Sequence, residues 1–74
     1  MLHKHSLTIK GHRTSITLED PFWDVLKTSA KQQGCSLSQL VEQIDEGRTE
    51  DTNLSSALRL FVLRELQKNS QQNT

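Results

Sequence analysis

The stretch HRTSITLEDPFW, residues 12–23, places a short alternating strand directly before the start of a helix. Polar and apolar residues alternate from Ser15 to Leu18, so Ile16 and Leu18 share one face of a half-buried strand. The opposite face then carries three polar side chains: Arg13, Ser15 and Thr17. A strand cannot satisfy its own backbone donors and acceptors, and the rest of the pattern is helical. We therefore expect a mainly α chain with one β-strand, whose partner strand comes from a second chain.

The segment SLTIK, residues 6–10, also alternates, but with the opposite parity. Its apolar residues have odd numbers, whereas Ile16 and Leu18 have even ones, so one unbroken strand would turn the two pairs to opposite faces. Gly11 lies at the change of parity and predicts a bulge or a tight turn there. We assign residues 1–11 to a basic N-terminal arm and residues 12–68 to the folded domain.

Helix boundary signals follow the strand. Asp20 as N-cap, Pro21 in the first turn and Gly34 as C-cap predict a helix over residues 21–33. A capping box from Ser36 to Gln39 opens a second helix, which should end near Glu46 or Gly47.

A third helix is expected over residues 54–67, with Asn53 as its N-cap. Its apolar residues are too numerous for one narrow stripe, so this helix should contact both its own subunit and a partner. The polar tail, residues 69–74, is predicted to be disordered.

Charge divides the chain although its formal net charge is zero. Residues 1–18 hold Lys4, Lys10 and Arg13 without any acid, and residues 19–74 hold six Lys or Arg against nine Asp or Glu. His3, His5 and His12 add to the basic N-terminal segment. The single cysteine excludes an intramolecular disulfide and favours a reducing, cytoplasmic location. No segment has the ~18 apolar residues of a membrane span.

The segment RTSITLEDPFWDVLKTSAKQQGCSLSQLVEQI, residues 13–44, resembles the ribbon-helix-helix DNA-binding domains of the Arc/MetJ repressor superfamily. The HRTS strand, the FW pair and the NLSSALRLFVL segment are similar to a bacterial subfamily of small ribbon-helix-helix proteins. The resemblance implies an intertwined homodimer with an intermolecular two-stranded antiparallel ribbon and an additional C-terminal helix. The ribbon would enter the major groove of double-stranded DNA.

Base reading is implied for Arg13, Ser15 and Thr17, which match the three reading positions of the family. Arg13 suits a bidentate contact to guanine, and the two hydroxyls read bases with less discrimination. Phosphate contacts are implied at the start of the second helix and in the basic arm: Ser36, Leu37, Ser38, Lys10 and His12.

Other interpretations of single residues are weaker. Phe22 and Trp23 could stack on bases, but their helix positions favour the core. Cys35 could sense redox state, but a small residue at a turn explains it better. A free amine with His3 in third position could chelate Cu(II) or Ni(II), although a flexible terminus rarely fixes a coordination shell.

The leading hypothesis is a sequence-specific DNA-binding transcriptional regulator of the repressor type, acting as a homodimer that could assemble to higher order on DNA. No nucleophile and base at catalytic spacing are found, so we expect no enzyme activity, no metal and no cofactor. The alternative is a dimeric protein-interaction module, or an antitoxin-like protein, that holds a protein partner through residues 54–67 and binds DNA weakly or not at all.

Overall fold

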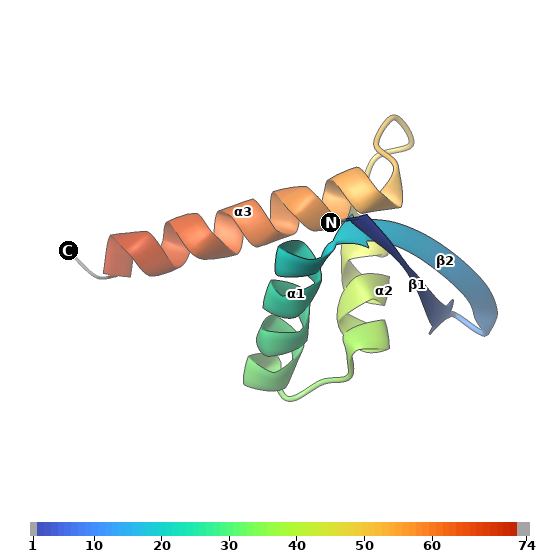
Figure 1. Cartoon of the computed structure of the whole chain (residues 1–74), viewed down its shortest axis with the longest axis horizontal. Coiled ribbons are helices and arrows are strands. Elements are labelled where there is room, and N and C mark those ends of the chain that lie inside the picture. Colours follow the sequence, from blue (N-terminus) through green and yellow to red (C-terminus); the bar gives the residue numbers. More distant parts are fainter. Residues whose placement is uncertain (1, 73–74) are drawn as a thin grey trace.

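A computed structural model describes the backbone of residues 2–72 and the side chains of residues 2–68. It contains a two-stranded antiparallel ribbon followed by three helices (Figure 1). The elements are β1 Leu2–Ile9, β2 His12–Glu19, α1 Asp20–Gln33, α2 Leu37–Gly47 and α3 Leu54–Gln72. The expected order of ribbon, helix, helix and additional C-terminal helix is confirmed. None of these helices is long and apolar enough to cross a membrane.

The ribbon is a hairpin within one chain, which corrects the expectation of a single strand. β1 pairs with β2 over their full lengths, from Leu2 opposite Glu19 to Ile9 opposite His12. The predicted tight turn is confirmed: Lys10 and Gly11 connect the strands and have positive φ values of 52° and 80°. A two-residue turn with positive φ at both positions matches the twist of the flanking strands. The basic arm is therefore mostly a strand.

The two-residue turn explains why the buried apolar residues have odd numbers in β1 and even numbers in β2. Each odd-numbered residue of β1 lies opposite an even-numbered residue of β2, as in His5 opposite Ile16 and Leu7 opposite Thr14. Ile9 and Ile16 are buried on the same face of the hairpin, together with Leu18. The two alternating segments thus form one amphipathic ribbon whose apolar face covers the helices.

The start of α1 differs from its prediction, whereas its end agrees. Glu19, not Asp20, occupies the N-cap position, and its side chain makes no capping hydrogen bond. Asp20 is already helical, and its carboxylate contacts His3 of β1 instead of capping the first turn of the helix. Gly34 ends α1 with the expected left-handed conformation.

The capping signals of α2 and α3 are confirmed. The Gln39 N–H donates to Ser36 Oγ at 3.0 Å, and the Ser36 N–H donates to Gln39 Oε1 at 2.8 Å. Asn53 Oδ1 accepts the Ser56 N–H at 2.8 Å. α3 continues to Gln72, five residues beyond the predicted end at Gln67, and residues 73–74 of the predicted disordered tail lie outside the described residues.

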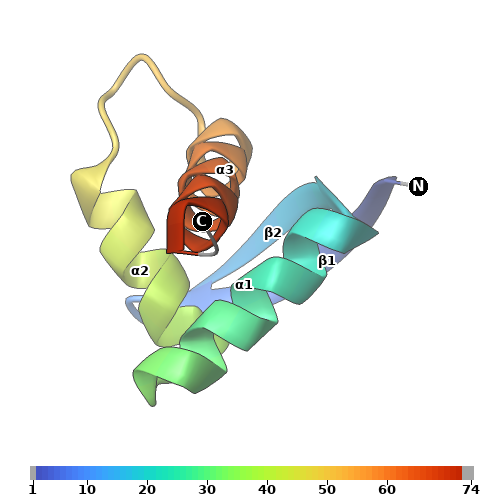
Figure 2. The same ribbon diagram turned by 90° about the vertical axis from the view of Figure 1, so that its left-hand side faces the viewer.

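The core lies between the ribbon and the three helices. Figure 2 looks nearly along α3, which lies between α2 and the ribbon, while α1 crosses in front of the strands. The largest fully buried side chains come from all of these elements except β1: Leu18, Leu26, Leu40, Val41, Leu58 and Val62. Phe22 and Trp23 are half-buried and pack against this core, as their helix positions predicted.

Replacing Gly11 by alanine should destabilise the fold by about 1–2 kcal/mol, because a side chain at φ +80° strains the backbone. Urea unfolding followed by circular dichroism measures the loss. Gly47→Ala is the matched control, since Gly47 is helical and has open space around its Cα. Equal stabilities of the two variants would show that the turn does not need its glycine.

Candidate nucleic-acid interface

The outer face of the hairpin carries two rows of polar side chains. One row comes from β2 and contains the predicted base readers Arg13, Ser15 and Thr17, which the structure brings together and leaves exposed. The other comes from β1, where each of those residues has a direct neighbour: Thr8, Ser6 and Lys4, respectively. Across residues 2–68, none of the six side chains is engaged in a hydrogen bond or an ion pair. The face is therefore free to donate hydrogen bonds to a ligand.

The β1 row was missed in the sequence, although its signal was present. Residues 6–10 alternate, but their pairing with β2 depends on the conformation of Lys10 and Gly11. Without that pairing, Lys4, Ser6 and Thr8 have no defined face.

Two histidines hold β1 against α1. His3 Nδ1 lies 2.5 Å from Asp20 Oδ1. The His5 ring stacks on Trp23 with 3.9 Å between ring centroids and 9° between planes. His5 Nε2 is buried and has no hydrogen-bond partner among the described residues. Trp23 is thus occupied by the protein itself and is not presented for stacking on a base.

His3 contacts Asp20. Among the side chains that the structure describes, residues 2–68, no three His, Cys, Asp or Glu side chains gather at one point. Cys35 is half-buried at the α1–α2 junction.

Lys10 and His12 do not lie on the outer face. The Lys10 N–H donates to Glu42 Oε1 at 2.9 Å, and its ammonium lies 3.6 Å from Glu46 Oε1. These contacts fix the turn to α2. His12 lies opposite Ile9, so its side chain projects from the inner face of the hairpin, whereas that of Arg13 projects from the outer face. The His12 side chain is exposed. Both residues flank one end of the ribbon.

The start of α2 lies at the α1–α2 junction, away from the ribbon of the same chain (Figure 1). Here the Ser36 N–H is used by the Gln39 side chain, which removes one of the three donors expected to bind phosphate. The N–H groups of Leu37 and Ser38 precede the first intrahelical bonds and remain available.

The second edge of β2 pairs with no other strand within residues 2–72. Because Ile9 and His12 close a two-residue turn, the β2 groups bonded to β1 belong to the even-numbered residues. The N–H and C=O groups of Arg13, Ser15 and Thr17 therefore point away from β1. The outward direction of the Thr17 carbonyl agrees with its hydrogen bond, since it accepts from Ser55 Oγ of α3 at 3.1 Å. A hollow of about 390 Å³ lies beside the edge, between residues 14–17 and the start of α3.

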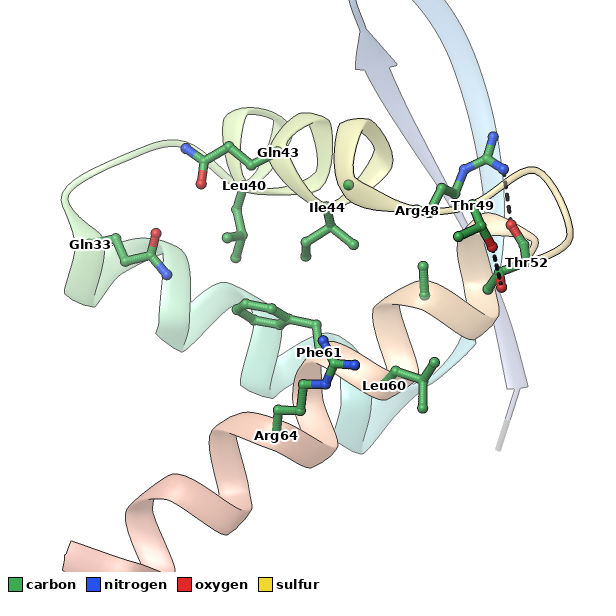
Figure 3. Close-up of a pocket in the computed structure, with 12 residues that line it drawn as sticks. Gln33, Leu40, Gln43, Ile44, Arg48, Thr49, Thr52, Leu60, Phe61 and Arg64 are labelled. Carbon is green, nitrogen blue, oxygen red and sulfur yellow. Dashed lines mark hydrogen bonds between the residues drawn. The ribbon is translucent and has the colours of Figure 1, made fainter.

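A second hollow, of about 440 Å³, separates α2 from α3 (Figure 3). Leu40 and Ile44 project into it from α2 toward Phe61 of α3, and Arg64 lies at its rim. Leu60, Leu63 and Leu66 of α3 are 48%, 49% and 50% exposed, respectively. α3 thus has an apolar face that the described residues leave about half exposed, in agreement with the excess of apolar residues in its sequence.

Two carboxylates at the junction of β2 and α1, those of Glu19 and Asp20, should make the melting temperature fall at acidic pH. The hydrogen bond from Arg59 lowers the pKa of Glu19, and the hydrogen bond from His3 lowers the pKa of Asp20. Because the folded state holds these protons less tightly than the unfolded state, both groups stabilise the fold at neutral pH and lose that effect in acid. The melting temperature should begin to fall as the pH drops through the range of ordinary carboxyls, about 4 to 4.5, and should continue to fall below it through the lowered pKa values of Glu19 and Asp20.

Glu19→Gln and Asp20→Asn should each flatten this decrease. Asp24→Asn is the control, since Asp24 only meets Lys27 at 3.7 Å on the exposed side of α1. The same acid dependence in all four proteins would assign the effect to other groups.

Comparison with known protein families agrees with the geometry. A family model described as a ribbon-helix-helix domain matches residues 2–66, which include β1 and most of α3. Comparisons with curated proteins and with solved structures gave no match. The match covers most of the chain, and the structure begins with a ribbon followed by two helices, in agreement with the description of the family. This chain therefore belongs to the ribbon-helix-helix domain family.

Proposed function

We propose that this chain is a sequence-specific DNA-binding protein that represses transcription as a homodimer in the bacterial cytoplasm. The family supplies the class, DNA-binding transcription regulators. The observation that carries the proposal is the exposed polar face of β2, on which Arg13, Ser15 and Thr17 have no partner among the described residues. A two-stranded ribbon of this kind fits the major groove.

Arg13 is the principal base reader in this proposal. Its guanidinium presents a planar fork of donors that matches O6 and N7 of guanine. Ser15 and Thr17 carry hydroxyls that donate or accept at neighbouring bases. One arginine in each of two chains would therefore place two guanine contacts symmetrically about the centre of the site.

The free edge of β2 suits the formation of a dimer. Two copies can pair their β2 strands antiparallel, because the outward groups at residues 13, 15 and 17 meet the same groups of the second copy. Ser15 would then lie opposite its own counterpart, and the Thr17 carbonyl would exchange the Ser55 hydroxyl for a backbone N–H. The hollow beside the edge offers space for the incoming strand.

Phosphate contacts would come from the start of α2 and from the ends of the ribbon. The free N–H groups of Leu37 and Ser38, with the Ser36 and Ser38 hydroxyls, form an anion-binding helix start. Lys10 and His12 add positive charge at the turn, although Lys10 also faces Glu46.

A second candidate function is that of a dimeric interaction module or an antitoxin-like protein. It is favoured by the uncovered leucines of α3 and by the hollow between α2 and α3. In this case α3 holds a protein partner, and DNA binding is weak or absent.

Fluorescence anisotropy with a mixed-sequence DNA duplex, at about 50 and 200 mM salt, tests the proposal. DNA binding predicts an affinity that decreases steeply as salt increases. No binding at the lower concentration would leave the interaction module. Sedimentation at micromolar concentration tests the dimer independently, because a stable folded monomer would contradict the shared ribbon.

A further inference from the structure

We infer that the outer face of β1 is a phosphate-binding row, in which Lys4, Ser6 and Thr8 contact the DNA backbone on both flanks of the ribbon. The inference rests on the proposed function and extends it to three residues of the N-terminal strand.

The first step is the placement of the row. Lys4, Ser6 and Thr8 lie directly opposite Thr17, Ser15 and Arg13, and all six side chains leave the same face of the hairpin. All six are exposed. Any surface that meets the base readers of β2 therefore also comes close to this row.

The second step is the width of the sheet. Dimerisation through the free edges of β2 gives the strand order β1, β2, partner β2, partner β1. Strands lie about 4.8 Å apart, so the axes of the two outer strands are separated by about 14 Å. The major groove is about 12 Å wide. The two central strands thus face the base edges, and the two β1 strands face the phosphates that border the groove.

The third step is chemistry. The β1 row offers one ammonium and two hydroxyls, which are donors suited to phosphate oxygens, whereas the guanidinium of this outer face, that of Arg13, lies in the β2 row. Lys10, Lys27, Arg48 and Arg59 each lie close to a carboxylate. Within the described part of the chain, Lys4 has no such partner, so its charge is available to DNA.

The fourth step is rigidity. β1 is held by the His3–Asp20 contact, by the stacking of His5 on Trp23, and by burial of Ile9. All three contacts use the inner face of the strand. The outer row is therefore fixed in position without using the side chains that would meet DNA, unlike the residues of a flexible arm.

The test measures the salt dependence of DNA binding for Lys4→Ala, Lys4→Arg and wild type on the same mixed-sequence duplex. Each phosphate contact contributes a slope of about 0.9 in log affinity against log salt, so Lys4→Ala should reduce the slope by about 2 per dimer. Between about 50 and 200 mM salt, wild type should then lose roughly tenfold more affinity than the variant. Lys4→Arg should keep the wild-type slope.

Lys27→Ala is the control for a general loss of charge, because Lys27 lies on the exposed side of α1. It should leave the slope unchanged, and selection from a random duplex pool should return the same preferred sequence for Lys4→Ala as for wild type. A wild-type slope in Lys4→Ala, or an altered preferred sequence, would overturn the inference while leaving the proposed function intact. Failure of wild type to bind at low salt would overturn both.

Discussion

Replacing Arg13 by alanine should weaken binding to a selected duplex by about 1–3 kcal/mol for each guanine contact, with two contacts per dimer. The guanidinium is exposed, lies on the outer face of β2 and has no partner among residues 2–68. Its removal should therefore cost binding without disturbing the core. Anisotropy with the preferred duplex and with a scrambled duplex measures the loss of affinity and of discrimination.

Two variants separate the chemistry of Arg13 from its charge. Arg64→Ala removes an equal charge from α3, beside the hollow that α3 forms with α2, and should bind as wild type does. Arg13→Lys keeps the charge but loses the planar fork, so it should retain the salt dependence and lose discrimination. If Arg13→Ala and Arg64→Ala bind equally well, Arg13 is not a base reader.

Leu58→Ala should reduce the free energy of unfolding by about 2–5 kcal/mol, because Leu58 is fully buried and the change leaves a cavity. For a chain this short, that loss is a large part of the total stability. Leu58 belongs to α3, so the variant also tests whether this helix is part of the core. Urea unfolding at several protein concentrations gives the measurement.

Leu63→Ala is the matched control, since it makes the same change on the opposite, half-exposed face of α3. Its cost should be well below that of Leu58→Ala in a single chain. A large cost that grows with protein concentration would show that a second copy covers this face. Equal, concentration-independent costs would contradict the burial pattern of α3.

The helix boundaries were predictable because their signals are local. The capping box from Ser36 to Gln39, the glycine at residue 34 and the Asn53 cap each act within one turn of a helix. Asp20 failed as a predicted cap for the opposite reason. Its partner His3 is seventeen residues away, and only the pairing of β1 with β2 brings the two together.

The β2 part of the candidate site was also predictable from a local signal, whereas the β1 part was not. Alternation alone places Arg13, Ser15 and Thr17 on one face, and the structure keeps them there. Lys4, Ser6 and Thr8 join that face only through the register of the hairpin, which depends on positive φ at Lys10. Lysine rarely adopts this conformation, so Gly11 predicted a break in the strand but not the two-residue hairpin that sets this register.

The two-residue turn also limits how this chain can change in length during evolution. If the turn kept two residues, one residue inserted between Ile9 and His12 would shift the pairing by one and reverse the faces of β1, turning Leu7 and Ile9 to solvent and Lys4 toward the apolar helices. Two inserted residues would preserve both faces and only lengthen the loop. Natural variation of this turn is therefore expected to occur in steps of two residues, except where a bulge restores the alternation.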